Sequence, residues 1–265
     1  GVTLDRTLSF KAHLSKTAMK LKTRINVLCK LTGTTWGATA STLRTSALAL
    51  VYSAAEYCCP VWARSSHTRM VESLLNTTMC LITGCLHSAP VPWLPVLANI
   101  APPRLRRQAA TAEMLLKILG NTRWPLHDDV VNHPPARLSS RRPIWSCDTS
   151  DITNQRWTDE WAEAIVVNHG LVSDPTIRQP GFDLPRQPWS LLNRFRTGQG
   201  TCRASLNRWG MAQSDLCQCG QRQTMTHIVD DCQLTKLDGG LEALYQADGT
   251  AVEWLNAVAT TAFAK

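Results

Sequence analysis

The sequence has no apolar run long enough to cross a bilayer and no apolar leader segment at its start. The longest apolar stretch, near residues 47–55, is short and interrupted, whereas a membrane helix needs about 20 apolar residues. We therefore expect no membrane partner and an intracellular, reducing compartment, in which the ten cysteines serve as core residues or metal ligands. Because the chain begins with Gly1 rather than Met, we expect it to be part of a longer polypeptide.

Motifs for catalysis are also missing. The sequence contains no Gly-rich dinucleotide fingerprint, no P-loop lysine and no nucleophile elbow. Two pairs of acids stand out, Asp128-Asp129 in a polar, Pro-flanked stretch and Asp230-Asp231 beside a cysteine. We interpret the first pair as an exposed turn and the second as solvated or as neighbours of a metal ligand. No catalytic residue is predicted.

Acidic residues are scarce in the first part of the chain. Residues 1–122 hold 14 Lys/Arg against 4 Asp/Glu, whereas residues 123–265 hold 14 against 16. Such an imbalance favours a polyanionic partner for the first part. A basic surface that only aids solubility is the alternative.

Apolar residues recur every three or four positions from Phe10 to Leu31, which predicts an amphipathic helix. The basic residues of this segment lie off the apolar stripe, and no acid accompanies them. We expect a nucleic-acid-binding face made of Lys11, Lys16, Lys20, Lys22 and Arg24. An ordinary solvated helix surface would have the same pattern.

The rest of the chain is predicted to be mainly α-helical. Residues 1–9 alternate like the end of a strand, residues 87–103 form an irregular Pro-rich crossing, and Gly249 bends or splits the last helix. We divide the chain into a basic helical domain (1–120), a Pro-rich linker with a short Trp-containing helix (121–188), and a smaller C-terminal helical region (189–265). The expected helices span about residues 39–57, 67–83, 102–119, 154–168, 189–196 and 239–263.

Three arginines, Arg104, Arg106 and Arg107, fall in the first turn of the helix that Pro102-Pro103 opens. This end of a helix disfavours cations, because the helix dipole is positive there. An anion such as phosphate is one explanation, and capping of the carbonyls of a neighbouring helix is the other.

Three cysteines and a histidine lie within sixteen residues, in the pattern C-x-C-x7-H-x4-C. Three thiolates and one imidazole form a complete tetrahedral set for structural zinc, with no position left for a substrate water. Unrelated residues in a Cys-rich chain are the alternative. The predicted ligands are Cys217, Cys219, His227 and Cys232, and the basic residues predicted to flank them are Arg194, Arg196, Arg203 and Arg208.

Several short motifs, in this order, resemble the C-terminal portion of a non-LTR retrotransposon reverse transcriptase of the jockey-like and CR1-like kind. The segment 1–14 is similar to that family's step from palm to thumb, and 31–37 to its thumb loop. The Cys/His cluster resembles its C-terminal zinc knuckle. The other matching segments are 57–62, 82–84 and 194–198.

This resemblance covers about residues 1–100 and 190–235 and leaves the middle unassigned. It implies a thumb-like helical bundle followed by a zinc knuckle, which together clasp the template–primer duplex, element RNA and target DNA. It also implies an upstream polymerase domain in the same polypeptide and a nuclear and cytoplasmic location. The family's catalytic aspartates and endonuclease lie outside this chain, so we expect no polymerisation by it alone. A degenerate copy that serves as a structural or protein-interaction module is the alternative.

Overall fold

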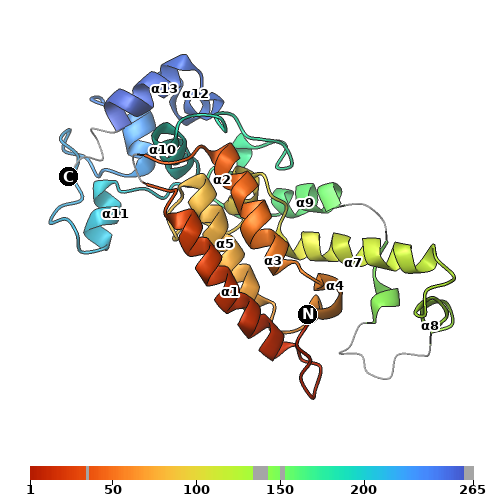
Figure 1. The fold of residues 1–265 in the computed structure, drawn as a ribbon. Coiled ribbons are helices and arrows are strands. Elements are labelled where there is room, and N and C mark those ends of the chain that lie inside the picture. Colours follow the sequence, from red (N-terminus) through yellow and green to blue (C-terminus); the bar gives the residue numbers. More distant parts are fainter. Residues whose placement is uncertain (34–35, 134–142, 150–152, 260–265) are drawn as a thin grey trace.

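The protein is mainly helical, as the sequence predicts, and the residues that the structure describes contain no β-strand. The computed structural model describes residues 1–33, 36–133, 143–149 and 153–259 (Figure 1). Residues 34–35 of the predicted thumb loop and 260–263 of the predicted last helix lie outside these ranges. The α-helices are α1 (Lys11–Cys29), α2 (Ala40–Ala47), α3 (Ser53–Ala55), α4 (Cys59–Trp62), α5 (Arg69–Thr83), α6 (Trp93–Ala98), α7 (Pro103–Leu119), α8 (His127–Val131), α9 (Thr153–Ala162), α10 (Arg186–Arg196), α11 (Arg203–Arg208), α12 (Gly240–Gln246) and α13 (Gly249–Trp254).

The first helices form a bundle in which α1 packs along α5 and the helical run from α2 to α3 packs against both (Figure 1). The apolar stripe predicted for α1 is its buried face, which includes Leu14, Leu21, Ile25 and Leu28. Burying such a stripe removes apolar surface from water and is the main source of stability for a helix of this kind. The four lysines of α1 consequently point away from the bundle.

The predicted second helix contains a wider turn. A π-helical segment, η1 (Leu48–Tyr52), joins α2 to α3. The guanidinium of Arg24 on α1 donates a hydrogen bond to the carbonyl oxygen of Leu50 in this segment. One guanidinium nitrogen of Arg24 therefore helps to hold α1 against the bundle.

The Pro-rich segment 87–103, which was predicted to be irregular, contains the helix α6. All six residues of α6 are buried, and Asn99 ends it in the left-handed conformation. A short, continuously apolar run shows no helical period, which is why the sequence did not reveal it.

The alternating pattern of residues 1–9 predicted the end of a strand, but the structure has a turn there. The carboxylate of Asp5 accepts hydrogen bonds from the backbone N–H and the hydroxyl of Ser9, and this closes a turn. Leu8 and Phe10 take positive φ values of 52° and 59° on either side of Ser9. Local side-chain hydrogen bonding replaces the ladder that the alternating pattern suggested.

One hydrophobic cluster runs from Leu14 in α1 to Ala259 near the end of the described chain. The segment predicted as a linker contributes Trp157 and Trp161 of α9, and the indole of Trp93 in α6 donates to the carbonyl of Val167 at 3.0 Å. Residues on both sides of the predicted boundaries at 120 and 188 thus belong to one hydrophobic cluster. A second, small cluster joins α7 to α8.

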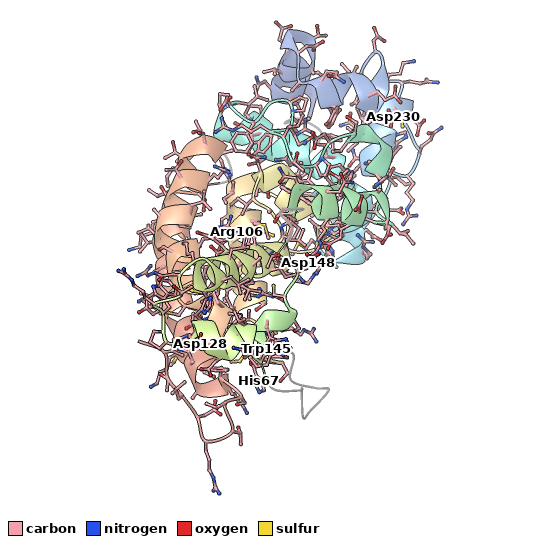
Figure 2. All side chains as sticks on the ribbon, turned by 90° about the vertical axis from the view of Figure 1, so that its right-hand side faces the viewer. His67, Arg106, Asp128, Trp145, Asp148 and Asp230 are labelled. Atoms are coloured by element: carbon pink, nitrogen blue, oxygen red, sulfur yellow. The ribbon has the colours of Figure 1, made fainter. Side chains whose placement is uncertain are left out.

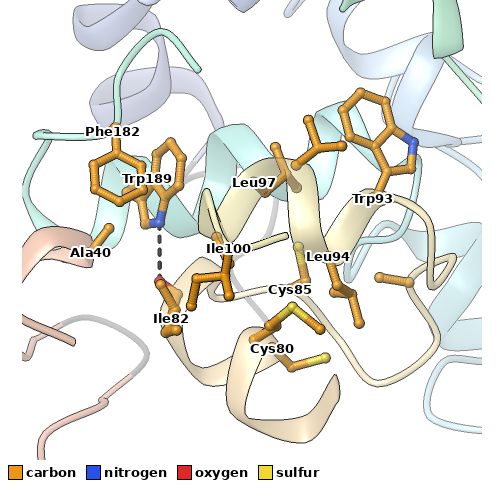
Figure 3. Packing of buried hydrophobic residues seen from close by; sticks show 14 of the residues in the cluster. Ala40, Cys80, Ile82, Cys85, Trp93, Leu94, Leu97, Ile100, Phe182 and Trp189 are labelled. Carbon is orange, nitrogen blue, oxygen red and sulfur yellow. Dashed lines mark hydrogen bonds between the residues drawn. The ribbon is translucent and has the colours of Figure 1, made fainter. Parts of the chain in front are cut away.

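Helix α10 crosses the C-terminal end of α5 and binds its last carbonyl groups. The carbonyl of Ile82 accepts the indole N–H of Trp189 at 3.2 Å (Figure 3). It also accepts a guanidinium N–H of Arg186 at 2.9 Å. Asn193 donates to the carbonyl of Thr83 at 2.9 Å. The end of a helix leaves such carbonyls without partners inside it, and here a helix about 100 residues later in the chain supplies them.

The last predicted helix is split, as Gly249 suggested. Ala247 takes a positive φ of 54° and ends α12, and the carboxylate of Asp248 accepts the backbone N–H of Ala251 to start α13. A π-helical segment, η5 (Leu255–Ala259), continues α13. The break thus falls at a capping aspartate just before the glycine.

Candidate metal centre and basic surfaces

The first two predicted ligands lie in a tight turn. The backbone N–H of Gly220 donates to the carbonyl of Cys217 at 3.0 Å, and the N–H of Cys217 donates to the carbonyl of Gln221 at 2.7 Å. Gly220 has a φ of 86°, a conformation that a residue with a side chain adopts at a cost. The turn directs Cys217 and Cys219 to the same side.

The other two ligands flank a π-helical segment, η4 (His227–Asp231). The backbone N–H of His227 donates to the hydroxyl of Thr224 at 3.0 Å, and the N–H of Cys232 donates to the carbonyl of His227 at 2.8 Å. Between them, Ile228 and Val229 are buried in the main core. The core thus anchors one half of the cluster while the other half is a surface turn.

The ligand atoms of these four residues converge, since all lie within 4.8 Å of one another. The sulfurs of Cys217 and Cys232 are 3.7 Å apart, and Cys219 Sγ is 3.2 Å from His227 Nε2. Tetrahedral coordination with metal–sulfur bonds of about 2.3 Å places two sulfurs about 3.8 Å apart. The residues therefore fit a metal ion, and the predicted cluster is confirmed as a group that could hold one.

The electrostatics of the cluster favour a thiolate at Cys232. Burial raises the pKa of the Cys232 thiol, but hydrogen bonds from Thr235, from the backbone N–H of Leu234 and from the neighbouring thiols outweigh it and lower the pKa to about 6. Thiolate is the form that binds a metal. Because Cys217, His227 and Cys232 are buried and four ligands complete a tetrahedron, the arrangement suits a structural ion rather than a catalytic one.

One residue, Gln223, joins the Cys/His cluster to the start of α11. Its amide oxygen accepts the backbone N–H of Arg203 at 2.9 Å, and its backbone carbonyl accepts the N–H of Ala204 at 3.0 Å. Its amide nitrogen lies 3.8 Å from Cys217 Sγ. The start of α11 is therefore fixed to the Cys217 turn, and the exposed Arg203 and Arg208 project from a helix that the cluster positions.

Most of the basic residues predicted on α1 are at the surface. Lys11, Lys16, Lys20 and Lys22 are exposed, while Arg24 is half-buried against η1. The helix contains no acidic residue. The Nζ of Lys16 also donates to the hydroxyl of Thr3 at 3.4 Å, a contact that an exposed side chain readily gives up.

The three arginines in the first turn of α7 do not form a free basic surface. Each pairs with a glutamate from another element: Arg104 with Glu160, Arg106 with Glu56 and Arg107 with Glu72. The bond to Glu56 raises the pKa of the Arg106 guanidinium, and Arg107 is buried. Arg106 and Arg107 thus bind carboxylates of the fold, and the cost of placing cations at this end of the helix is offset by carboxylates that the sequence pattern did not reveal.

Arg194 and Arg196 also need correction as nucleic-acid contacts. Arg196 has no exposed surface, and one of its nitrogens donates to the carbonyls of Pro180 and Tyr245 at 2.7 and 2.8 Å. Burial lowers its pKa to about 9, so it keeps its charge at neutral pH. Arg194 is half-buried at the carbonyl of Gly84. The sequence placed both correctly on one helix, but their donors are directed at backbone carbonyls inside the protein rather than at solvent.

One member of each acid pair lies at the start of a helix. Asp128, with its side chain 89% exposed, lies in the first turn of α8 (Figure 2). Asp230 accepts the backbone N–H of Leu241 at 2.8 Å and so caps the start of α12. Among the other histidines, His13 is buried rather than at the surface, and its Nδ1 accepts the N–H of Thr3 at 3.3 Å.

No family model, curated protein or solved structure matches this chain. Within the part of the chain that the structure describes, none of the helices combines the length and apolar character needed to span a membrane. The function must therefore be argued from the residues themselves.

Proposed function

We propose that this chain is a nucleic-acid-binding part of the RNA-directed DNA polymerase of a non-LTR retrotransposon, and that it does not catalyse polymerisation alone. The observation that carries the binding proposal is the outer face of α1. Four lysines are exposed on one helix that contains no acid. Lysines on a surface without acids bind phosphates and release counterions, which gives affinity independent of sequence.

The second contact region in this proposal is α11. Arg203 and Arg208 are exposed there, and the metal cluster fixes the start of the helix through Gln223. The ion that we propose is zinc, because three thiolates and one imidazole in a closed tetrahedron are its typical structural ligands. The attribution to a retrotransposon polymerase depends on the motif resemblance, and an upstream reading frame without a polymerase block would contradict it.

Nucleic-acid binding through α1 predicts a specific salt dependence. Lys16→Gln together with Lys20→Gln is expected to weaken binding to an RNA–DNA hybrid and to reduce the slope of log affinity against log salt by about 2, one for each lost phosphate contact. The measurement is fluorescence anisotropy with a labelled hybrid at several salt concentrations. The control variant, Lys117→Gln with Arg123→Gln, removes the same charge from exposed positions outside α1.

An affinity that does not change with salt, or an equal loss in both double variants, would contradict this role for α1. That result would favour a protein-interaction module instead. Val27, Leu31 and Trp36, at the end of α1 and in the loop after it, are exposed apolar residues that suit such a module.

Zinc affinity is expected to fall as the pH is lowered. Metal binding to this cluster requires deprotonated thiols and a neutral imidazole, so protons compete with the ion. Binding should release protons, and the apparent affinity for zinc should decrease steadily from pH 8 towards pH 5. Competition titrations with a chromophoric chelator at each pH measure this, and an affinity that is constant over the range would be inconsistent with thiolate ligands.

A further inference from the structure

A polar cavity lies beside the first two turns of α7, away from both the metal cluster and α1. Its volume is about 530 Å³, and four arginines line it, Arg64, Arg104, Arg107 and Arg156. Figure 2 faces this side of the molecule, where Asp148 lies near α7. The polar side chains that complete the lining include Thr68, Gln108, Thr111 and Ser146.

Carboxylates hold the arginines of this cavity in place. Arg107 pairs with Glu72 and is itself buried, while Arg156 pairs with Asp148 and Arg104 with Glu160. The Nη1 of Arg104 also donates to the amide oxygen of Gln108 at 3.3 Å. Each guanidinium has five N–H donors, so a pair with one carboxylate leaves capacity for a second anion.

A larger apolar cavity adjoins the polar one. It measures about 920 Å³, and Arg64 lines both. Helix α7 also lines both, with Arg107 and Thr111 facing the polar cavity and Met114 and Ile118, on the next two turns, facing the apolar one. The other apolar lining residues are Leu8, Phe10, Pro60, Val61, Trp124, Leu126 and Ile144.

Three residues that line the apolar cavity have an unusual backbone conformation. Leu8, Phe10 and Cys58, all of which line it, have positive φ values between 52° and 59°. In residues other than glycine, this conformation costs about 1–2 kcal/mol each, and such residues concentrate where a binding site is shaped. Three of the six such residues in the described chain line this one cavity.

We propose that the two cavities form one site for an organic phosphate, with the phosphate among the arginines and its apolar substituent in the larger cavity. A phosphate monoester offers close to two charges and three acceptor oxygens, which guanidinium groups bind in a bidentate manner. Each cavity by itself is within the size range of common small-molecule sites. A nucleoside monophosphate and an alkyl phosphate share this chemistry.

The test uses isothermal titration calorimetry on the full chain with three probes: adenosine monophosphate, octyl phosphate and inorganic phosphate. At least one organic phosphate is expected to bind more tightly than inorganic phosphate. Arg104→Gln with Arg156→Gln should weaken it by about tenfold or more, since hydrogen bonds to charged groups are lost. The two carboxylates left behind are 38% and 52% exposed, so water can solvate them and the chain stays folded.

The matched control, Arg178→Gln with Lys236→Gln, removes the same charge from exposed positions that line neither cavity and should change phosphate affinity by less than about twofold. Trp124→Ser should weaken only the organic phosphates. The proposal is overturned if neither organic phosphate binds at about 1 mM, if inorganic phosphate binds as tightly as both, or if the two double variants lose equal affinity. Because the hybrid-binding test above uses α1, either proposal can fail without the other.

Discussion

Replacing Cys232 by serine is expected to reduce the metal content from about one ion per chain to none. Cys232 is fully buried, and its sulfur lies 3.7 Å from that of Cys217. A serine hydroxyl at this position is a poor zinc ligand, and three remaining ligands would leave the ion bound weakly. The measurement is metal analysis of protein purified without chelators.

The loss of the ion should unfold the chain locally rather than globally. Ile228 and Val229 anchor η4 in the core whether or not the metal is bound. Residues 205–224, which hold the Cys217 turn and most of α11, contribute no residue to that core. Limited proteolysis should therefore cut between about residues 206 and 224 in Cys232→Ser, while overall helicity is retained.

The control for this variant is Cys29→Ser, which changes an exposed cysteine outside the cluster and should retain the metal. Wild-type protein without metal, or Cys232→Ser with a full complement, would refute the metal centre. Global loss of helicity in Cys232→Ser would instead contradict the separate anchoring of η4.

Replacing Gly84 by alanine should destabilise the fold by about 2–5 kcal/mol, from backbone strain and overpacking together. Gly84 has a φ of 70° at the end of α5, and an added Cβ would lie 2.9 Å from the Cα of Ser190 on α10. Since this contact is with backbone, no rotamer change relieves it, and α10 must move away from the carbonyls that it caps. Urea unfolding monitored by circular dichroism measures the effect.

The variant Gly210→Ala separates the effect of backbone strain from that of overpacking. Gly210 has a similar φ of 73°, but an added Cβ there meets no atom within 4 Å. This control should therefore show only the backbone strain, about 1–2 kcal/mol. Equal destabilisation in the two variants would mean that the close contact between α5 and α10 contributes nothing.

The structure could be predicted from the sequence where it depends on residues that are close together along the chain. The stripe of α1, the glycine at the end of α5 and the prolines opening α7 all follow from helix geometry, and each predicted element is present. The spacing of Cys217, Cys219, His227 and Cys232 sufficed for the metal cluster, because its ligands are close in sequence.

Predictions failed where the partner lies far along the chain. The basic character of Arg106 and Arg196 is plain in the sequence, but Glu56 is 50 residues from Arg106, and the carbonyl of Tyr245 is 49 residues from Arg196. Only the tertiary structure shows that such cations are already paired or buried. The clearest available signal was the placement of three arginines in the first turn of α7, which is unfavourable unless anions are near.

The cap that α10 places on α5 also constrains the order of folding during synthesis. Arg186 and Asn193 contact carbonyls that precede them by 104 and 110 residues. When α5 has left the ribosome, its last turn has no partners, and the surface that Trp189 will cover is still open. Closing so long a loop is slow relative to helix formation. The N-terminal bundle therefore cannot complete its packing until residues 186–196 have been synthesised. A nascent chain that stalls before this point exposes apolar surface to which chaperones bind.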